Sequence, residues 1–322
     1  MKRNLVLSLI ALFLCAPYAK ADNDLFERMV LIEEFTTEKC PNCPSNAALL
    51  EEVMALPEYA GKLIATTHHS GYYTDFLTTE ADNAYIWFYN YKSNYAPAIM
   101  FDRYPFFETK GRPGTDQRKP TPVALINTMN NFKKYIGKRL DVKAHVGFYL
   151  TGEFENDNTI TVRVAGARDS LFTETTPRIT VFLVENGIQS KQQAGAGSDF
   201  KHNHVLRTYN NIWGDVINWN GDAFEYECKL TVDPSWVKEN TQVVAFVHAF
   251  DSENPGNCVI ENARVINYET ILGIEDVQND GELVNTEYFT LDGVKTAPSV
   301  SGMYVQKKTF SDGRVETKKI IR

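Results

Sequence analysis

Cysteine is scarce in this sequence: its 322 residues include five, at positions 15, 40, 43, 228 and 258. So few cysteines exclude a small disulfide-dense fold. Basic residues are also in deficit, with 33 Lys and Arg against 41 Asp and Glu and a formal net charge of −8. Because binding to a phosphate backbone depends on a surplus of positive charge, the sequence predicts no nucleic-acid partner.

The N-terminus has no hydrophobic run long enough for a membrane span. The apolar run Leu5–Cys15 is about half of the roughly 20 residues that a spanning helix needs. It follows Lys2 and Arg3 and precedes Ala19-Lys20-Ala21, which is the order of a secretory signal peptide. We therefore expect cleavage after Ala21, an exported mature protein and no transmembrane helix after cleavage.

Cleavage would remove three basic residues, no acidic residue and Cys15. The mature chain then has 30 basic and 41 acidic residues and a net charge of −11. Lipidation of Cys15 is the alternative, which is disfavoured because the large Leu14 stands where a small residue is expected. Four cysteines remain in a chain that leaves the cytoplasm, where disulfides can persist.

Residues 22–140 alternate between strand and helix patterns, which predicts an α/β domain. A Thr-Pro pair at Thr121 is typical of a helix start, and apolar residues then recur every three to four positions up to Leu140. The expected strands are Met29–Ile32, Leu63–Thr67 and Ala98–Phe101, and the expected helices cover 41–56, 80–92 and 121–140.

After residue 141 the hydrophobic period changes from 3.6 to 2, which is typical of strands. The expected strands cover 145–150, 159–164, 178–184, 224–232, 243–250 and 259–265. Their number and the turn signals between them predict an antiparallel, Ig-like β-sandwich over 141–270. A short β-like unit, with a hairpin turn at Asp312-Gly313, is expected over 271–322. The predicted fold class is therefore α+β multidomain.

The motif Cys40-Pro41-Asn42-Cys43 lies where a predicted strand leads into a predicted helix. With Pro41 at the first helical position, the helix N-terminus would favour a thiolate at Cys40. Cys40 is then the nucleophile of thiol–disulfide exchange and Cys43 the more buried resolving thiol. An inert structural disulfide is one alternative. Half of a zinc site is another, disfavoured because no second cysteine pair follows at ligand spacing.

Two further residues fit a redox interpretation of this motif. Glu34 lies on the incoming strand, six residues before Cys40, where it could point beneath the disulfide. A buried carboxylate there would have a raised pKa and could exchange a proton with the resolving cysteine, whereas a solvated acid at a strand end is the alternative. Pro97 precedes a strand, and a cis peptide bond before it would place its loop against the disulfide.

The remaining candidates each allow two interpretations. The neighbouring His68 and His69 point to opposite faces of a strand and cannot readily bind one metal together, but one of them could lie near the disulfide. Cys228 and Cys258 form either a structural disulfide or two buried free thiols. The polar segment His202-Asn203-His204, with Arg207, forms either a ligand site or local turn and interface hydrogen bonds. No cofactor is expected.

The order of strand, Cys-x-x-Cys motif, helix, X-Pro before a strand and closing amphipathic helix resembles the thioredoxin fold. In this resemblance Glu34 takes the place of that family's buried acid, and Pro97 takes the place of its cis-proline. Lys39 stands where the family usually has a tryptophan, so contacts with the substrate are expected to differ.

A narrower resemblance is carried by three segments, Leu31–Thr36, Cys40–Pro44 and His202–Arg207. In order and character they are similar to the Omp28-related family of Bacteroidetes outer-membrane proteins, over roughly residues 28–268. That family joins a thioredoxin-like domain to a β-sandwich. The tail, through Leu291-Asp292-Gly293 and Gly302-Met303-Tyr304, resembles the C-terminal sorting domains of type IX secretion cargo, which implies association with the outer membrane or the secretion machinery.

Two functions from different classes follow. The first is an exported thiol–disulfide oxidoreductase of the outer membrane, cell surface or periplasm, whose partners are protein thiols and disulfides. The second is a cell-surface binding or adhesion protein that uses the thioredoxin-like domain as a scaffold for a surface ligand.

Overall fold

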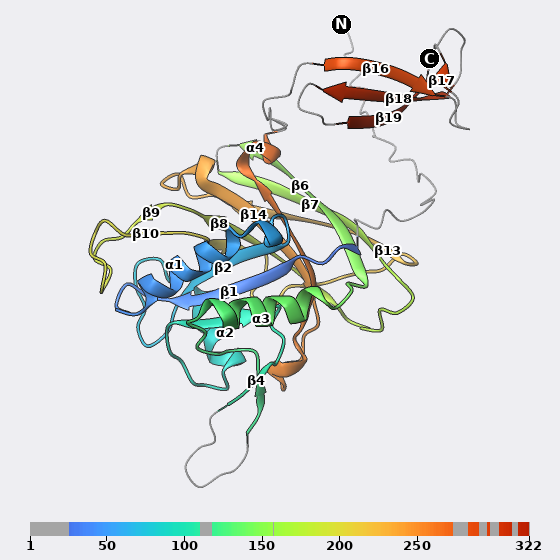
Figure 1. The fold of residues 1–322 in the computed structure, drawn as a ribbon. Helices are drawn as coiled ribbons and strands as arrows, with labels where there is room; N and C mark the ends of the chain where they lie inside the picture. The colour runs from blue at the N-terminus through green and yellow to red at the C-terminus, as the bar shows by residue number, and fades with distance from the viewer. Residues whose placement is uncertain are drawn as a thin grey trace, which may run out of the picture. The chain divides into compact units, whose positions relative to one another are not determined.

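The computed structural model describes residues 26–109, 118–156 and 158–272, together with 283–289, 295–296, 303–310 and 315–321. The chain divides into two compact units, one ending at Leu272 and one starting at Gly273. Each has its own sheets, and the described residues form a mixed α+β fold with four α-helices (Figure 1). The predicted signal peptide lies outside the described residues.

The first unit combines short helices with many strands. Its α-helices are α1 (Cys43–Met54), α2 (Glu80–Tyr89), α3 (Met129–Leu140) and α4 (Tyr268–Ile271). Its first strands are β1 (Val30–Thr36), β2 (Leu63–His69), β3 (Ala98–Phe101), β4 (Phe107–Glu108), β5 (Pro120–Thr121), β6 (Val146–Asn156) and β7 (Thr159–Arg168). The others are β8 (Arg178–Glu185), β9 (Ile188–Gln189), β10 (Lys201–His202), β11 (Val205–Tyr209), β12 (Asp215–Val216), β13 (Ala223–Thr231), β14 (Thr241–His248) and β15 (Ile260–Asn267).

One large sheet runs through the first unit in the order β15-β14-β8-β11-β2-β1-β3, and β12 pairs with β8. β1 and β2 are parallel, whereas β3 is antiparallel to β1. The link between early and late strands is the parallel pair β2–β11, where the Thr67 N–H donates to the His204 carbonyl over 2.6 Å. Strands from both sides of the predicted domain boundary at 140/141 therefore share one sheet, and the boundary itself stays a prediction.

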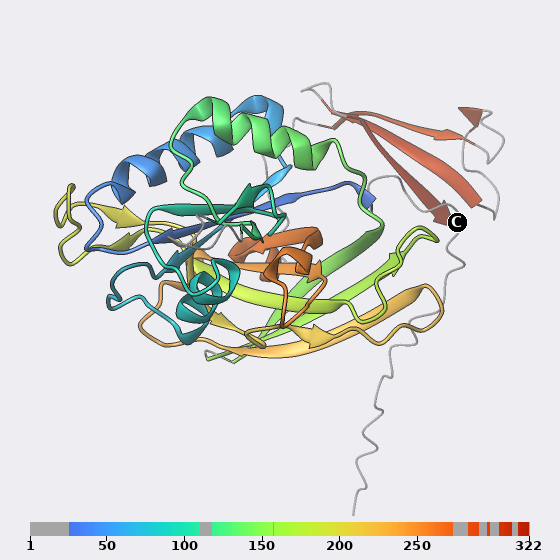
Figure 2. The same cartoon turned by 90° about the horizontal axis from the view of Figure 1, so that it is seen from below.

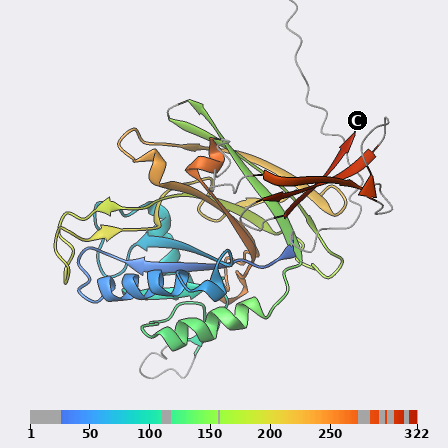
Figure 3. The same cartoon turned by 45° about the horizontal axis from the view of Figure 1, so that its top comes forward.

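The β1–β2–β3 part of this sheet is covered on both faces. On one face, Leu50 and Val53 of α1 and Phe132 and Ile136 of α3 pack on alternate residues of the three strands. Figures 2 and 3 show α1 and α3 side by side on this face. On the other face, buried aromatic residues of α2 pack with Phe182 of β8 and other residues of the later strands. Because both faces of this part of the sheet are covered, every residue of β1 and β2 is buried.

A three-stranded antiparallel sheet in the order β13-β7-β6 packs against β8 and β14. Alternation along β8 divides its side chains between two clusters. Ile179, Val181 and Leu183 face the three-stranded sheet, while Phe182 and Val184 face the cluster that includes α2. Successive side chains of β8 therefore point to opposite faces of the large sheet, and both faces are packed.

The predicted strands of the first unit and the helix over 80–92 are confirmed, with ends that shift by a few residues. The predicted start of the next helix, at Thr121, is wrong. Thr121 belongs to β5 and Ala124 bridges to Ile99 of β3, so pairing with neighbouring strands overrides the Thr-Pro signal. The N-cap lies seven residues later, at Thr128, whose side chain accepts a hydrogen bond from the Asn131 N–H, and the helix starts at Met129.

The second unit forms one antiparallel sheet in the order β17-β16-β18-β19. Its strands are β16 (Leu283–Phe289), β17 (Lys295–Thr296), β18 (Met303–Phe310) and β19 (Val315–Ile321). The predicted turn at Asp312-Gly313 and the Leu291-Asp292-Gly293 segment lie outside the described residues. In the described part of the chain no helix has the length and hydrophobicity to cross a membrane.

Candidate functional site

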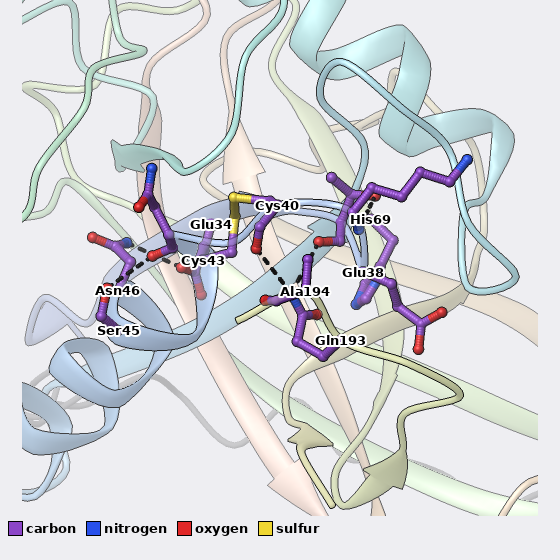
Figure 4. The surroundings of a disulfide bond; sticks show 12 residues. Glu34, Glu38, Cys40, Cys43, Ser45, Asn46, His69, Gln193 and Ala194 are labelled. Carbon is purple, nitrogen blue, oxygen red and sulfur yellow. Dashed lines mark hydrogen bonds between the residues drawn. A yellow bond between two sulfur atoms is a disulfide. The ribbon is translucent and has the colours of Figure 1, made fainter. Parts of the chain in front are cut away.

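A disulfide joins Cys40 and Cys43, whose Cα atoms are 5.4 Å apart (Figure 4). Cys40 is 7% exposed and Cys43 is 1% exposed. The difference agrees with the predicted order, in which Cys40 is the accessible cysteine and Cys43 lies behind it. The predicted roles in exchange stay a proposal.

The helix after the motif starts later than the sequence suggested. Cys43 is the first residue of α1, Asn42 is its N-cap and Pro44 is the proline of the first turn. Cys40 instead lies in a turn before the helix, where its N–H donates to the Thr37 carbonyl over 3.0 Å. Pro41 is therefore not the first helical residue, and the positive end of the helix dipole lies at Cys43 and not, as the sequence suggested, at Cys40.

Glu34 lies on β1 with its side chain fully enclosed, next to the start of α1 (Figure 4). Its Oε1 accepts a hydrogen bond of 3.0 Å from Nδ2 of Asn46, which lies one turn after Cys43. Burial raises the pKa of Glu34 to about 7; the Asn46 hydrogen bond opposes that rise, and the charge of Glu51 adds to it. The pKa is thus raised, as predicted for a buried carboxylate, and the predicted exchange of a proton with Cys43 stays a proposal.

The Ala96–Pro97 peptide bond is cis, as predicted. The strand that follows runs antiparallel to β1, with Ala98 opposite Phe35. Pro97 and Asn42 of the cysteine motif line one groove of about 1750 Å³. The proline loop and the disulfide turn thus border the same groove, which Asn42 lines and neither cysteine does.

The hairpin formed by β9 and β10 packs against the cysteine motif, and nothing in the sequence pattern predicted it. Nε2 of Gln193, in the hairpin loop, donates to the carbonyl of Cys40 over 2.9 Å and to that of Thr37 over 3.4 Å. At Gly195, where φ is +84°, a Cβ atom would lie 2.5 Å from the Pro41 carbonyl oxygen. Only glycine fits this contact, because the obstacle is backbone.

Glu38 attaches the same hairpin to the residues just before Cys40 (Figure 4). Its Oε1 accepts hydrogen bonds from Ser190 Oγ, at 2.5 Å, and from the N–H groups of Lys191 and Gln192, at 2.7 and 3.4 Å. Its carbonyl accepts from the Ala194 N–H at 2.7 Å. One wall of the disulfide site therefore comes from a segment about 150 residues later in the chain.

His69 and His202 meet beside this wall. Their rings are 4.7 Å apart, His69 Nδ1 lies 2.8 Å from Asp75 Oδ2, and His202 Nε2 lies 3.8 Å from Glu38 Oε1. Burial lowers the pKa of His202 to about 4, so its ring is neutral at pH 7. Among the described residues no group of three or more His, Cys, Asp or Glu side chains could hold a metal ion.

His68 belongs to a different, fully buried network. Its Nδ1 lies 2.8 Å from Asp82 and its Nε2 lies 3.2 Å from Glu33. Glu33 in turn forms two hydrogen bonds, both under 3 Å, with the Arg103 guanidinium. The side chains of the adjacent histidines therefore lie in separate surroundings, and of the two only His69, the last residue of β2, lies beside the hairpin that packs against the cysteine motif.

The other polar residues of the His202–Arg207 segment make interface contacts. Asn203 Nδ2 donates to Glu51 of α1 over 2.8 Å, and His204 Nε2 lies 3.3 Å from the same carboxylate. Arg207 pairs with Glu185 of β8 at 3.3 Å. Contacts between segments, one of the two interpretations left open by the sequence, are thus present, while the ligand site stays a prediction.

Cys228 and Cys258 are both free, so the bridge that the sequence allowed between them is not formed. The reason is their place in the fold: Cys228 on β13 packs against the cluster under the three-stranded sheet, whereas Cys258 is buried in the cluster that includes α2. Burial raises the pKa of the Cys228 thiol to about 11 and also raises that of Cys258. Neither is a reactive thiolate near neutral pH.

Comparison with known proteins gives matches of two kinds. The model of the family "Outer membrane protein Omp28" matches residues 107–266. Among solved structures, HBP35 of Porphyromonas gingivalis is similar with a TM-score of 0.60 and 20% identity, over 92% of this chain and 99% of that one. No curated protein matches significantly.

A domain of the outer membrane lipoprotein Omp28 from Porphyromonas gingivalis is also similar, with 25% identity over 38% of this chain and 88% of that one, at a TM-score of 0.27. The likeness to HBP35 shows a shared fold. The family match covers most of the strands after residue 141 and the segment before them. The chain therefore belongs to the Omp28 family of outer membrane proteins and is an exported protein of the outer membrane, the cell surface or the periplasm.

Proposed function

We propose that this protein carries out thiol–disulfide exchange in the cell envelope, with Cys40 and Cys43 as its redox pair. The observation that carries the proposal is the placement of the disulfide. It lies at the start of α1, next to a buried carboxyl group with a pKa of about 7 and beside the groove that Pro97 lines. An inert disulfide needs neither of these neighbours.

In the reduced protein the Cys40 thiolate attacks one sulfur of a substrate disulfide. A mixed disulfide forms, and the other substrate sulfur leaves as a thiolate. Cys43 then loses its proton to the Glu34 carboxylate and attacks the Cys40 sulfur, which releases the second substrate thiol and restores the Cys40–Cys43 disulfide. Two electrons pass from the protein to the substrate, and the reverse sequence oxidises a substrate dithiol.

The arrangement of the early strands supports a thioredoxin-like domain over 22–140. β2, β1 and β3 lie in that order, β1 and β2 are parallel, and β3 follows the cis-proline and runs antiparallel. The packing of β6, β7 and β13 on β8 and β14 supports a β-sandwich over 141–270. We retain both as proposals about the domains of the first unit.

Reduction of insulin disulfides by dithiothreitol tests the redox proposal. We expect the wild-type protein to accelerate the reaction and the Cys40→Ser variant to lose the acceleration completely. Cys228→Ser is the matched control, because Cys228 is a half-buried thiol outside the site, and it should keep the wild-type rate. Equal rates with and without Cys40 would refute the proposal.

A binding or adhesion protein is the second candidate, and one observation favours it. The hairpin of β9 and β10 encloses the cysteine turn and leaves Cys40 only 7% exposed. A disulfide enclosed in this way can stabilise a scaffold whose other surfaces bind a ligand. If insulin reduction is absent while removal of both cysteines lowers the melting temperature, this second function is the better one.

The second unit supports a separate proposal about location. Its small antiparallel sheet of β16 to β19 fits the sorting-domain resemblance of the tail, so we propose that residues 271–322 direct the protein to the cell surface. Deletion of 273–322, which leaves the first unit intact, should leave the protein in the periplasm, as measured by protease accessibility on intact cells. Unchanged surface exposure of the deletion variant would contradict this role.

A further inference from the structure

The loop that follows β2 exposes aromatic side chains beside the disulfide turn. Tyr72, Tyr73 and Phe76 are 65%, 57% and 43% exposed, and they lie within five residues. Large apolar groups that gather at one place on a surface commonly mark a contact site. Aromatic side chains are also the groups that contribute most to binding between proteins.

Two contacts hold this loop next to the cysteine motif. Oδ2 of Asp75 accepts a hydrogen bond of 2.8 Å from the N–H of Glu38, two residues before Cys40. Gly71 lies so close to the proline loop that a Cβ atom there would be 2.8 Å from the Cβ of Ala96. The aromatic side chains are therefore placed between the two segments that flank the redox pair.

Two exposed lysines complete this surface, one from each side of the loop. The Nζ of Lys39, which directly precedes Cys40, lies 5.2 Å from the centre of the Tyr73 ring, and that of Lys191 in the hairpin lies 4.2 Å from the Phe76 ring. In the described part of the chain neither ammonium group forms an ion pair with a carboxylate. We call Lys39, Tyr72, Tyr73, Phe76 and Lys191 the aromatic rim.

Among the described residues, the nearby carboxylates of Glu38 and Asp75 form no ion pair with these lysines, because their oxygens accept hydrogen bonds from other groups. Glu38 accepts hydrogen bonds from three hairpin donors, and Asp75 is held by His69 and by the Glu38 N–H. A cation over an aromatic ring keeps its charge and most of its hydration, so it can still attract an anion. The protein as a whole is acidic, with a net charge of −8, yet this rim presents two positive charges.

We propose that the aromatic rim is the docking surface for the substrate, and that it selects a polypeptide with acidic and apolar side chains next to its reactive cysteine. The inference rests on the proposed redox function and specifies its substrate class. Apolar side chains of the substrate pack on the three rings, and its carboxylates approach Lys39 and Lys191. The charges mainly raise the rate of productive encounter.

The test measures how fast Cys40 reacts with matched peptides. Reduced Cys43→Ser protein is mixed with a peptide whose cysteine carries a nitrothiobenzoate leaving group. The Cys40 thiolate attacks the peptide sulfur, a protein–peptide disulfide forms and coloured nitrothiobenzoate leaves as a thiolate. The peptides are Glu-Phe-Cys-Phe-Glu, Lys-Phe-Cys-Phe-Lys and Glu-Ala-Cys-Ala-Glu, each blocked at both ends.

At low ionic strength the acidic aromatic peptide should react about tenfold faster than the basic one. The ratio should fall to about twofold or less at high salt, because exposed charges are screened. Charge reversal in a Lys39→Glu/Lys191→Glu variant should invert the preference. A matched Lys143→Glu/Lys229→Glu variant, which changes two exposed lysines outside the rim, should keep it. The Tyr73→Ser/Phe76→Ser variant should lose the advantage of the aromatic peptide over the alanine peptide.

The uncharged 2-hydroxyethyl disulfide separates this inference from the proposed function. If Cys40 reacts with it but treats the three peptides alike, or if the matched lysine variant loses the preference as well, the rim is not a docking surface. If Cys40 reacts with none of the disulfides, the redox function itself fails.

Discussion

Glu34 is the residue whose chemistry depends most on its surroundings. Its ordinary pKa of 4.5 is raised to about 7, chiefly because its carboxylate loses contact with water. The folded protein therefore holds the proton more tightly than the unfolded chain does. The stability that this proton contributes is fully present below pH 4.5 and is lost as the pH rises through 7.

The first prediction concerns the stability of a Glu34→Gln variant. Glutamine keeps the oxygen that accepts from Asn46 but carries no charge, so the variant should gain stability relative to wild type as the pH rises from 4.5. Above pH 7 the difference should level off at roughly 3 kcal/mol. Urea unfolding of both oxidised proteins at several pH values measures it. A difference that does not vary with pH would contradict the raised pKa.

The second prediction concerns catalysis by the same variant. Without a proton acceptor next to Cys43, release of the mixed disulfide should slow by on the order of 10²-fold. Attack by Cys40 on 2-hydroxyethyl disulfide should change much less, because Glu34 acts on the other cysteine. Stopped-flow measurement of the two steps distinguishes them, and the release step of the wild type should depend on a group that titrates near pH 7. Equal slowing of both steps would point to a structural defect instead.

At the scale of elements, the hairpin of β9 and β10 packs against the disulfide turn, and we expect it to limit access to the disulfide. It contacts the cysteine turn through backbone atoms and the amide of Gln193. Two glycines in its loop offer a matched pair, since both have positive φ, +84° at Gly195 and +81° at Gly197, but only Gly195 touches Pro41.

The third prediction compares Gly195→Ala with Gly197→Ala. Both substitutions introduce backbone strain of about 1 kcal/mol. Only Gly195→Ala must also push the hairpin away from Pro41, so it alone should speed the reduction of the Cys40–Cys43 disulfide by dithiothreitol. The rate of reduction, followed by thiol labelling, checks this. The same rate in both variants would mean that the hairpin does not limit access.

Local patterns predicted most elements of this fold but few of its contacts. The alternation along Val181–Val184 and the apolar strand before Cys40 were enough to place strands, because periodicity is a local property. The start at Thr121 was wrong because Ala124 pairs with β3, a partner more than twenty residues away. The contact between Gln193 of the hairpin loop and the Cys40 carbonyl could not be predicted for the same reason. The two residues lie about 150 positions apart, and no local sequence pattern indicates that they meet.

At the scale of the whole first unit, a buried charge network lies beside the large sheet, around Glu33 of β1. Burial alone would raise the pKa of Glu33, but the Arg103 guanidinium and His68 hold it down to about 2. Arg103 also donates to the hydroxyl of Tyr89 on α2 over 2.7 Å and lies 4.8 Å from the ring centre of Phe246 on β14. Arg103 thus contacts both an early strand, through Glu33 of β1, and a late strand, through Phe246 of β14.

The fourth prediction concerns this charge network. Arg103→Met leaves the Glu33 charge buried without its partner and should lower the free energy of unfolding by about 3–5 kcal/mol. Arg103→Lys should not restore it, because an ammonium group cannot form both hydrogen bonds to Glu33. The exposed Arg163, which also pairs with two carboxylates, is the matched control, and Arg163→Met should change little. Urea unfolding measures all three, and a small loss for Arg103→Met would contradict a central role.

The pairing of β2 with β11 has a consequence for how the protein is made. Synthesis and export deliver the chain from its N-terminus, so both cysteines emerge long before the strand and the hairpin that will enclose them. During that interval the pair lies in an unfinished sheet, open to the oxidants of the compartment it enters. The envelope can therefore set the first redox state of the centre before the later half of the chain closes over it.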